Sequence, residues 1–293
     1  SLLTKFLATT DKIITQSQAN KSYLTQVLGF EEKKIKVIYN PHPSYSHLID
    51  KVLLNKINQN KKEALNYWKP EITENFWREN HKLVGAKVQK KYRDFFNKSL
   101  FSRMIQSSDS KTKFFFISSQ NRAYKGFKQL FYSLNEFSKL TSSNFTLITT
   151  GSLSNEELHL SENYNWAFKN VYEFKKVNDF NHALLYSVSD LVIHSSFAEG
   201  GLGVFPLFEA ASINKLCLMN EGTHTKELLE CYPFLNDLCV DFNFPDIVAD
   251  KMLYFLNNDK KRNEYISYIQ KIIEEKNNSI QDYKNYFIEE FKN

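Results

Sequence analysis

The chain has 293 residues, 42% of them hydrophobic, so it can bury one large core or two modest ones. A net charge of +5 is too small for the dense basic face of a nucleic-acid-binding protein, and the apolar runs are far shorter than the roughly 20 residues of a membrane-spanning helix. The three cysteines form no CxxC pair, which argues against a disulfide framework or a zinc knuckle and favours a reducing cytoplasm.

The start of the chain predicts a strand, a helix and a second strand. A β-rich run at 11–16 precedes Ser17, a suitable N-cap for a helix at 18–28 that stops at Gly29. A second β-rich run follows at 35–39. These residues lack the basic and apolar layout of a secretory signal, and no initiator Met precedes them.

Residues 47–113 differ from the rest in charge. They hold 15 Lys and Arg against 7 Asp and Glu, a net of +8, whereas the other residues sum to −3. Apolar residues at helical spacing predict two helices broken at Pro70, with one buried stripe and a basic side that faces solvent or, alternatively, an anionic membrane surface. The stripe consists of Ile72, Phe76, Val84, Val88, Tyr92, Phe96, Leu100 and Met104, and the basic side of Lys87, Lys90, Lys91, Arg93, Lys98 and Arg103.

From residue 114 onward, short β-rich runs alternate with helical stretches. This alternation predicts an α/β fold with a Rossmann-like, doubly wound parallel sheet. Strands are expected at 114–118, 145–149, 170–174, 190–194, 215–219 and 238–242. Helices are expected at about 125–140, 155–163, 179–188, 206–213, 223–230 and 245–257, followed by an amphipathic helix at about 259–292.

Glycine marks the first candidate site. The chain has only eight glycines, and three of them, at 200, 201 and 203, follow the strand that ends at His194. In open parallel sheets ligands bind at the carboxyl ends of strands. Pro206 is a suitable first residue for the next helix, so the free N–H groups before it favour an anion such as phosphate. Glu199 and Glu209 flank this turn, where they either hold sugar hydroxyls or are simply solvated acids.

The second candidate site is the loop after the strand at 114–118. It carries Arg122 and Lys125 at a strand end that faces a helix N-terminus, where two cations can neutralise a diphosphate. The alternative is a solvated turn that carries surface charge.

The stretch from Phe197 to Ala211 resembles a known family. It is similar to the Glu-x7-Glu region of retaining nucleotide-sugar glycosyltransferases of the GT-B fold (glycosyl transferases group 1, family 4-like), which has a Glu-Gly, a Gly-rich turn, Pro and Glu-Ala. The preceding Ser187 to Ser196 is similar to that family's lead-in strand, and Glu227 stands where the family has a second-loop Glu. The resemblance extends from 11 to about 257, although nine residues separate the two acids here.

This resemblance implies a hexosyltransferase that moves a hexose from a nucleoside-diphosphate sugar to a glycan or lipid-linked acceptor with retention, as in polysaccharide biosynthesis. It implies catalytic roles for Glu199, which would orient the donor sugar, and for Arg122 and Lys125, which would stabilise the leaving diphosphate. The substrate-binding residues that it implies are Glu209 for the ribose, Gly200, Gly201, Leu202, Gly203 and Val204 in the anion-binding turn, Gly151 near the nucleotide and Lys176 near the base.

No metal and no cofactor are expected. GT-B enzymes seldom need a bound metal, and His42, His182 and His224 have no metal-ligand spacing. The expected partners are the nucleotide-sugar donor and the acceptor, without nucleic acid. The expected location is the cytoplasm, with a peripheral place at the inner membrane face if the basic segment binds lipid.

The resemblance also divides the chain. Residues 1–46 would be an inter-domain segment, 47–113 a basic helical insertion, and 114–293 the nucleotide-sugar-binding domain with its C-terminal helix. Because GT-B enzymes carry two Rossmann-like domains, we expect the acceptor domain to be missing and this chain alone to bind donor without transferring sugar. Two alternatives stay open: a donor-binding module that needs a partner, and a non-enzymatic α/β interaction protein with structural glycines.

Overall fold

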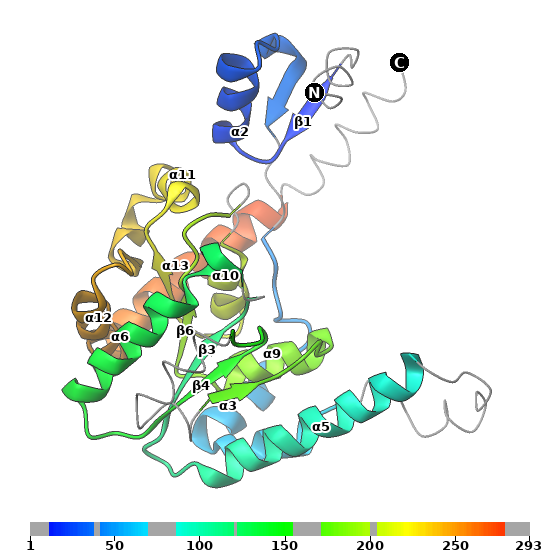
Figure 1. Cartoon of the computed structure of the whole chain (residues 1–293), viewed down its shortest axis with the longest axis vertical. Helices are drawn as coiled ribbons and strands as arrows, with labels where there is room; N and C mark the ends of the chain where they lie inside the picture. Colours follow the sequence, from blue (N-terminus) through cyan, green and yellow to red (C-terminus); the bar gives the residue numbers. More distant parts are fainter. Residues whose placement is uncertain are drawn as a thin grey trace.

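The main body of the protein is a six-stranded parallel sheet with helices on both faces (Figure 1). The computed structural model describes residues 12–37, 42–69, 86–119, 122–154, 171–199 and 204–278. The strand order is β5-β4-β3-β6-β7-β8, and every neighbouring pair is parallel. The predicted doubly wound sheet is therefore confirmed. Its strands are β3 (Lys113–Ile117), β4 (Phe145–Thr149), β5 (Val171–Glu173), β6 (Leu191–His194), β7 (Cys217–Asn220) and β8 (Cys239–Val240).

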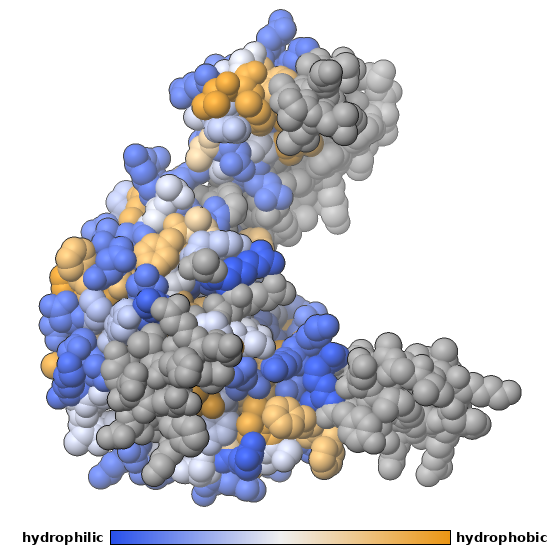
Figure 2. Space-filling model, viewed as in Figure 1, coloured by the Kyte–Doolittle hydropathy of each residue, from blue (hydrophilic) through white to orange (hydrophobic). Residues whose placement is uncertain are grey.

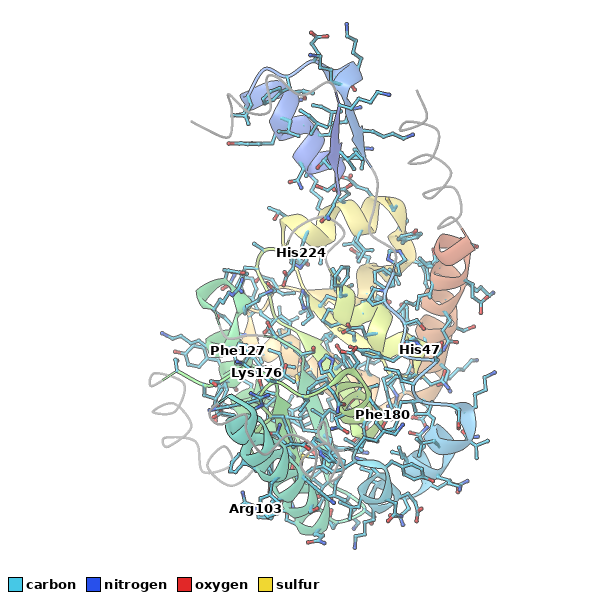
Figure 3. All side chains as sticks on the ribbon, turned by 90° about the vertical axis from the view of Figure 1, so that its right-hand side faces the viewer. His47, Arg103, Phe127, Lys176, Phe180 and His224 are labelled. Carbon is cyan, nitrogen blue, oxygen red and sulfur yellow. The ribbon has the colours of Figure 1, made fainter. Side chains whose placement is uncertain are left out.

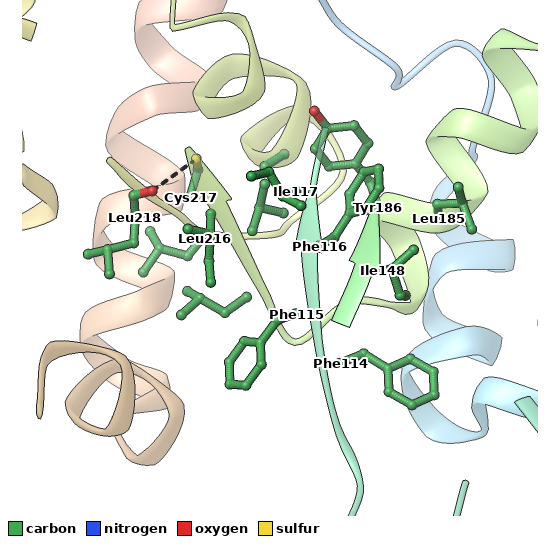
Figure 4. Close-up of a cluster of buried hydrophobic side chains, with 14 of the residues drawn as sticks. Phe114, Phe115, Phe116, Ile117, Ile148, Leu185, Tyr186, Leu216, Cys217 and Leu218 are labelled. Atoms are coloured by element: carbon green, nitrogen blue, oxygen red, sulfur yellow. Dashed lines mark hydrogen bonds between the residues drawn. The ribbon is translucent and has the colours of Figure 1, made fainter. Parts of the chain in front are cut away.

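The central strand β3 is apolar on both sides because helices cover both faces of the sheet. The Phe115 ring packs edge-on against Phe137, with centroids 5.1 Å apart, and Phe116 packs against Tyr186 on the opposite face at 4.6 Å (Figure 4). The first face is covered by α6 (Phe127–Leu140) and α12 (Pro245–Asn257), and the second by α9 (Asp179–Val188) and α10 (Phe205–Ser212), with α13 (Asp259–Asn278) against α10. Between β7 and β8 lie α11 (Thr223–Cys231) and the 3-10 helix η5 (Pro233–Leu238).

A small unit precedes this body. Its helix begins after Ser17, whose Oγ accepts a hydrogen bond from Asn20 N at 3.0 Å, and ends before Gly29, which has φ +71°; both predicted helix ends are confirmed. Its elements are β1 (Ile13–Thr15), α2 (Gln18–Ser22), the π-helix η1 (Tyr23–Val27), the 3-10 turn η2 (Glu32–Lys34) and β2 (Ile35–Val37), which pairs with β1.

An acid on α11 joins the small unit to the sheet domain. The Glu227 carboxylate accepts hydrogen bonds from Gln18 N at 2.7 Å and Ala19 N at 3.4 Å, the first two residues of α2. Ile13 and Ile35 are buried within the small unit but do not join the hydrophobic cluster of the sheet domain. The attachment at Glu227 is thus polar, and the carboxylate satisfies N–H groups that a helix leaves unpaired.

Residues 47–113 pack on the sheet domain through the same core. They form α3 (Lys51–Gln59), the 3-10 helix η3 (Lys61–Tyr67) and α5 (Ala86–Ser107), whereas Pro70 lies outside the described residues. The Trp68 ring packs at a tilt against the Phe101 ring of α5, with ring centroids 4.8 Å apart. Lys61 Nζ lies 2.5 Å from Asp190 Oδ2, which also accepts a hydrogen bond from Phe114 N at 2.7 Å. The segment is therefore held at the start of β3 and β6.

The predicted apolar stripe of this segment is partly wrong. Leu100 and Met104 are buried, but Phe96 is 54% exposed. The buried face of α5 also includes Asn97, Phe101 and Ile105. A helix completes a turn every 3.6 residues, so each step of four drifts by about 40°, and two such steps from Met104 carry Phe96 off the buried face. Ile72, Phe76 and Val84, together with the side chains of Val88 and Tyr92, lie outside the described residues.

Two loops touch at the carboxyl edge of the sheet. Gly126, the N-cap of α6, has φ +66°, and a Cβ at this position would lie 2.1 Å from the carbonyl oxygen of Ser195. Only glycine combines this left-handed backbone with so close an approach. The loop after β3 and the loop after β6 are therefore in backbone contact.

We expect Gly126→Ala to reduce the free energy of unfolding by about 3 kcal/mol or more, because it adds a steric clash to backbone strain. Gly29→Ala is the matched control: its φ is +71°, but nothing lies within 4 Å of the new Cβ, so strain alone should cost about 1–2 kcal/mol. Chemical denaturation measures both. Equal losses in the two variants would show that the loop contact contributes nothing.

Candidate functional site

A pocket of about 690 Å³ opens where the strand order reverses, between the carboxyl ends of β3 and β6. The chain leaves β3 toward β4 and leaves β6 toward β7, so the two following loops diverge and open a crevice between them. The pocket is lined by Ser118, Ser119, Arg122, Lys125, His194, Glu199, Phe205, Pro206 and Glu209. The structure thus brings together four residues that the sequence singled out, two cations and two acids from three segments.

An ion pair crosses the pocket between the two loops. Lys125 Nζ contacts Glu199 Oε1, and both side chains are largely buried. Backbone hydrogen bonds fix the loops on either side: Phe197 N donates to Tyr124 O at 2.8 Å, and Ser195 Oγ donates to Lys125 O at 2.7 Å. The Lys125 ammonium is consequently held at the pocket with a carboxylate as its counter-ion, where an anionic ligand would compete with Glu199 for it.

The second cation lies at the exposed side of the same loop. Arg122 Nη1 donates a hydrogen bond to the Tyr124 hydroxyl at 2.9 Å, and Lys125 Nζ lies 5.1 Å from the centroid of the same ring. Tyr124 therefore keeps both cations on one side of the pocket. Their spacing along the loop suits a ligand with two linked anionic groups.

Glu209 sits at the other wall in a buried hydrogen-bond network. The Tyr186 hydroxyl donates to Oε2 at 2.5 Å, and the Tyr45 hydroxyl donates to Oε1 at 3.2 Å. Tyr45 also contacts His182 Nδ1 at 2.7 Å, and His182 Nε2 contacts Ser118 Oγ at 2.8 Å. Four side chains from three segments thereby hold the Glu209 carboxyl group in one position.

Burial sets the charge states of this network. It raises the pKa of Glu209, an effect that the hydrogen bonds from Tyr186 and Tyr45 oppose. It also raises the pKa of both phenols, with the nearby Glu209 carboxylate as a further cause, and lowers the pKa of His182 to about 4. Near neutral pH the two tyrosines and His182 are thus uncharged, and the tyrosine hydroxyls are available as donors.

Comparison with known proteins shows the family of the chain. Residues 100–272 match the family described as Glycosyl transferases group 1. The chain belongs to this family. The predicted resemblance to GT-B glycosyltransferases is thereby confirmed. No curated protein sequence matches the chain significantly.

Solved structures of other glycosyltransferases share the fold of this group 1 chain. A glycosyltransferase from Rickettsia africae is 17% identical with a TM-score of 0.61, over 97% of this chain and 67% of that one. Anabaena HepE, solved with UDP-glucose, is 17% identical with a TM-score of 0.56, over 91% and 59%. WaaG, involved in lipopolysaccharide biosynthesis, is 11% identical with a TM-score of 0.59, over 90% and 58%. This chain thus spans about three fifths to two thirds of their lengths.

The remaining predicted site residues of this group 1 chain lie elsewhere or outside the described residues. Val204 is the buried N-cap of α10, and Pro206 is the second helical residue rather than the first, because Phe205 already has helical geometry. Gly151 follows β4 in a turn closed by Thr149 Oγ1, and Lys176 follows β5 with φ +50° (Figure 3); neither lines the pocket. Gly200, Gly201, Leu202 and Gly203 lie outside the described residues.

Sequence reasoning missed several residues that line the pocket or hold Glu209 in it. His194 and Ser118 end or follow a strand at the carboxyl edge, a position that alone marks them as candidates. Tyr45 and Tyr186 carry no such signal, because they approach Glu209 only through tertiary packing. Within the described ranges no group of three or more His, Cys, Asp or Glu side chains could hold a metal ion, and no helix there is long and apolar enough to span a bilayer.

We expect Tyr186→Phe to lower the free energy of unfolding by about 1.5–3 kcal/mol, because it removes a hydrogen bond to a buried carboxyl group. Tyr132→Phe on α6 is the matched control, since the Tyr132 hydroxyl makes no hydrogen bond within the described residues. Urea denaturation of both variants gives the comparison. A loss in Tyr186→Phe no larger than that in Tyr132→Phe would contradict the role of the network.

Proposed function

We propose that this group 1 chain binds a nucleoside-diphosphate hexose and serves in the retaining transfer of that hexose to a glycan or lipid-linked acceptor. One observation carries the proposal: the pocket at the reversal of strand order sets Arg122 and Lys125 opposite Glu199 and Glu209. Cations and carboxylates on opposing walls suit a ligand that has a diphosphate at one end and hydroxyl-rich sugars on either side of it.

The diphosphate would lie between the two cations and the N-terminus of α10. Arg122, Lys125 and the N–H groups of residues 203–205, with Gly200, Gly201 and Leu202 before them, would stabilise the negative charge that develops on the departing diphosphate. Binding of this anion would draw Lys125 away from Glu199. The Glu199 carboxylate would then be available to accept hydrogen bonds from hydroxyls of the transferred hexose.

The nucleoside would lie on the Glu209 side. Each Glu209 oxygen accepts one phenol hydrogen bond and keeps a further lone pair for a ribose hydroxyl. Gly151 and Lys176, at the ends of the next strands along the sheet, would lie near the nucleotide and the base.

We assign residues 1–46 to an inter-domain segment, 47–113 to a helical insertion and 114–293 to the nucleotide-sugar-binding domain.

We also propose a cytoplasmic location at an anionic membrane surface, with α5 as the contact. Phe95 and Phe96 on α5 are 72% and 54% exposed, and Lys98 and Arg103 on the same helix are exposed. Figure 2 shows hydrophobic and hydrophilic side chains next to each other along α5. Exposed aromatic rings beside cations in a segment of net charge +8 suit the headgroup region of anionic lipids, where a lipid-linked acceptor would be found.

For the donor site we expect UDP or GDP to bind without divalent metal, and Arg122→Ala to weaken that binding by about 10- to 100-fold through loss of a charge-assisted contact. Arg103→Ala, an exposed arginine on α5, is the control and should bind like the wild type. Calorimetry measures both. Equal affinities for wild type and Arg122→Ala would falsify the diphosphate assignment.

The assignment of Glu209 to the ribose predicts a different pattern. Glu209→Ala should weaken binding of UDP or GDP but leave binding of inorganic pyrophosphate unchanged, since pyrophosphate has no ribose. The same calorimetric titrations test this. Equal losses for the nucleotide and for pyrophosphate would count against a ribose role.

For the membrane we expect the chain to co-sediment with phosphatidylserine-containing vesicles at low salt and to be released at high salt. We expect a lower bound fraction for each of two double variants, Phe95→Ser with Phe96→Ser and Lys98→Gln with Arg103→Gln. Lys226→Gln/Lys271→Gln removes the same charge from two exposed sites on other helices and should leave the bound fraction unchanged. If the wild-type chain stays in the supernatant at low salt, the membrane contact is wrong.

A further inference from the structure

Two buried imidazoles lie side by side behind the Glu199 end of the pocket. His194 is the last residue of β6 and lines the pocket, and His224 is the second residue of α11. Their rings pack edge to face with centroids 5.5 Å apart. They are 4% and 2% exposed. The side chains therefore lie almost completely within the protein.

Three of the four ring nitrogens in this pair lack a hydrogen-bond partner among the described residues. His194 Nε2 and both ring nitrogens of His224 are buried without a hydrogen bond to any described residue, whereas both nitrogens of His182 on the Glu209 side are bonded. The nearest acidic oxygen, Glu199 Oε1, is 3.6 Å from His194 Nε2, which is beyond hydrogen-bonding distance. A buried polar atom without a partner is costly, so a ligand that supplied one would be favoured.

The charge state of the pair selects the kind of ligand. Burial lowers the pKa of His194 to about 3 and that of His224 to about 4, so both rings are neutral at neutral pH. A neutral imidazole offers one donor and one acceptor but no charge with which to hold an anion. A hydroxyl also donates and accepts, so it suits a position between a neutral imidazole and a carboxylate.

The neighbouring backbone keeps space for the His224 ring. A Cβ at Gly222 would lie 2.8 Å from His224 Cε1 and 2.7 Å from the carbonyl oxygen of Phe197. Since Phe197 belongs to the loop that carries Glu199, the same glycine lets His224 and this loop pack closely. His224, which does not line the pocket, therefore packs against the ring of His194 and supports it.

We propose that His194 binds the transferred sugar of the donor, with one sugar hydroxyl bonded to both His194 Nε2 and Glu199 Oε1 once the diphosphate has drawn Lys125 away, and with His224 as a positioning residue beside His194. The proposal rests on the proposed function, because it requires that the pocket hold a nucleotide sugar. In this proposal His194 contacts only the hexose of the donor and neither its diphosphate nor its ribose.

The test measures by calorimetry how tightly the full chain binds a nucleotide sugar and the matching nucleotide. UDP-glucose is compared with UDP, and GDP-mannose with GDP. His194→Leu should weaken binding of the nucleotide sugar by about 3- to 10-fold, as for loss of a neutral hydrogen bond, and leave that of the nucleotide within twofold. His194→Gln, which keeps a polar group near the position of Nε2, should recover part of the loss. His224→Leu should show a smaller loss of the same kind.

His47→Ala is the control, because His47 is exposed and lies away from His224 (Figure 3). His194→Leu should not lower the melting temperature, since the nitrogen that it removes is buried without a partner. If His194→Leu nevertheless unfolds, His194→Gln and His224→Leu carry the comparison. Equal loss for sugar and nucleotide, or no loss for either, overturns the role of His194 alone. Failure of the wild type to bind any of the four ligands overturns the proposed function instead.

Discussion

The carbonyl oxygen of Ser195 occupies the place that a side chain at residue 126 would need, and the site depends on this approach of two backbones. It brings the loop after β3 against the loop after β6, which sets Lys125 beside Glu199 and lets Phe197 N bond to Tyr124 O. A parallel sheet leaves its strand ends at one edge, but it does not by itself determine how closely neighbouring loops pack. In this chain the left-handed backbone of Gly126 and its missing side chain allow the two loops to pack closely.

The two acids of the pocket are held by different chemistry. Glu199 has a cation as its partner, so an anion that attracts Lys125 changes the surroundings of Glu199. Glu209 has two neutral phenols as partners, both fixed by packing, and a ligand need not displace either. One acid therefore responds to the ligand whereas the other is organised before the ligand arrives, and preorganised polar groups avoid a reorganisation cost during binding.

The fold could be predicted because its signals are local. Runs such as Phe114 to Ile117 predict buried strands, and Ser17 and Gly29 mark helix ends through their own backbone and side-chain chemistry. The pocket could be predicted in outline, since residues at the ends of neighbouring parallel strands must meet. These signals need no knowledge of how distant segments pack.

The rest of the site depends on distant packing. Tyr45 reaches Glu209 across 164 positions of sequence, and nothing near either residue announces the pair. Phe96 on α5 shows why sequence spacing alone can mislead. It lies four residues before the buried Leu100, but a helix completes a turn in 3.6 residues, so Phe96 is rotated off the buried face and is exposed. His194 could be placed at a strand end, but its lack of a partner depends on how α11 packs behind it.

The carboxylate of Glu227 at the first turn of α2 has a mechanical consequence for the small unit. An acid against a helix N-terminus is attracted over a range of angles, whereas interlocked apolar side chains fit in one orientation only. Since Ile13 and Ile35 stay within the small unit, rotation about this point would expose none of the sheet domain's core. A change in the angle between the small unit and the sheet domain would therefore strain the two hydrogen bonds to Glu227 and leave the hydrophobic cluster of the sheet domain packed.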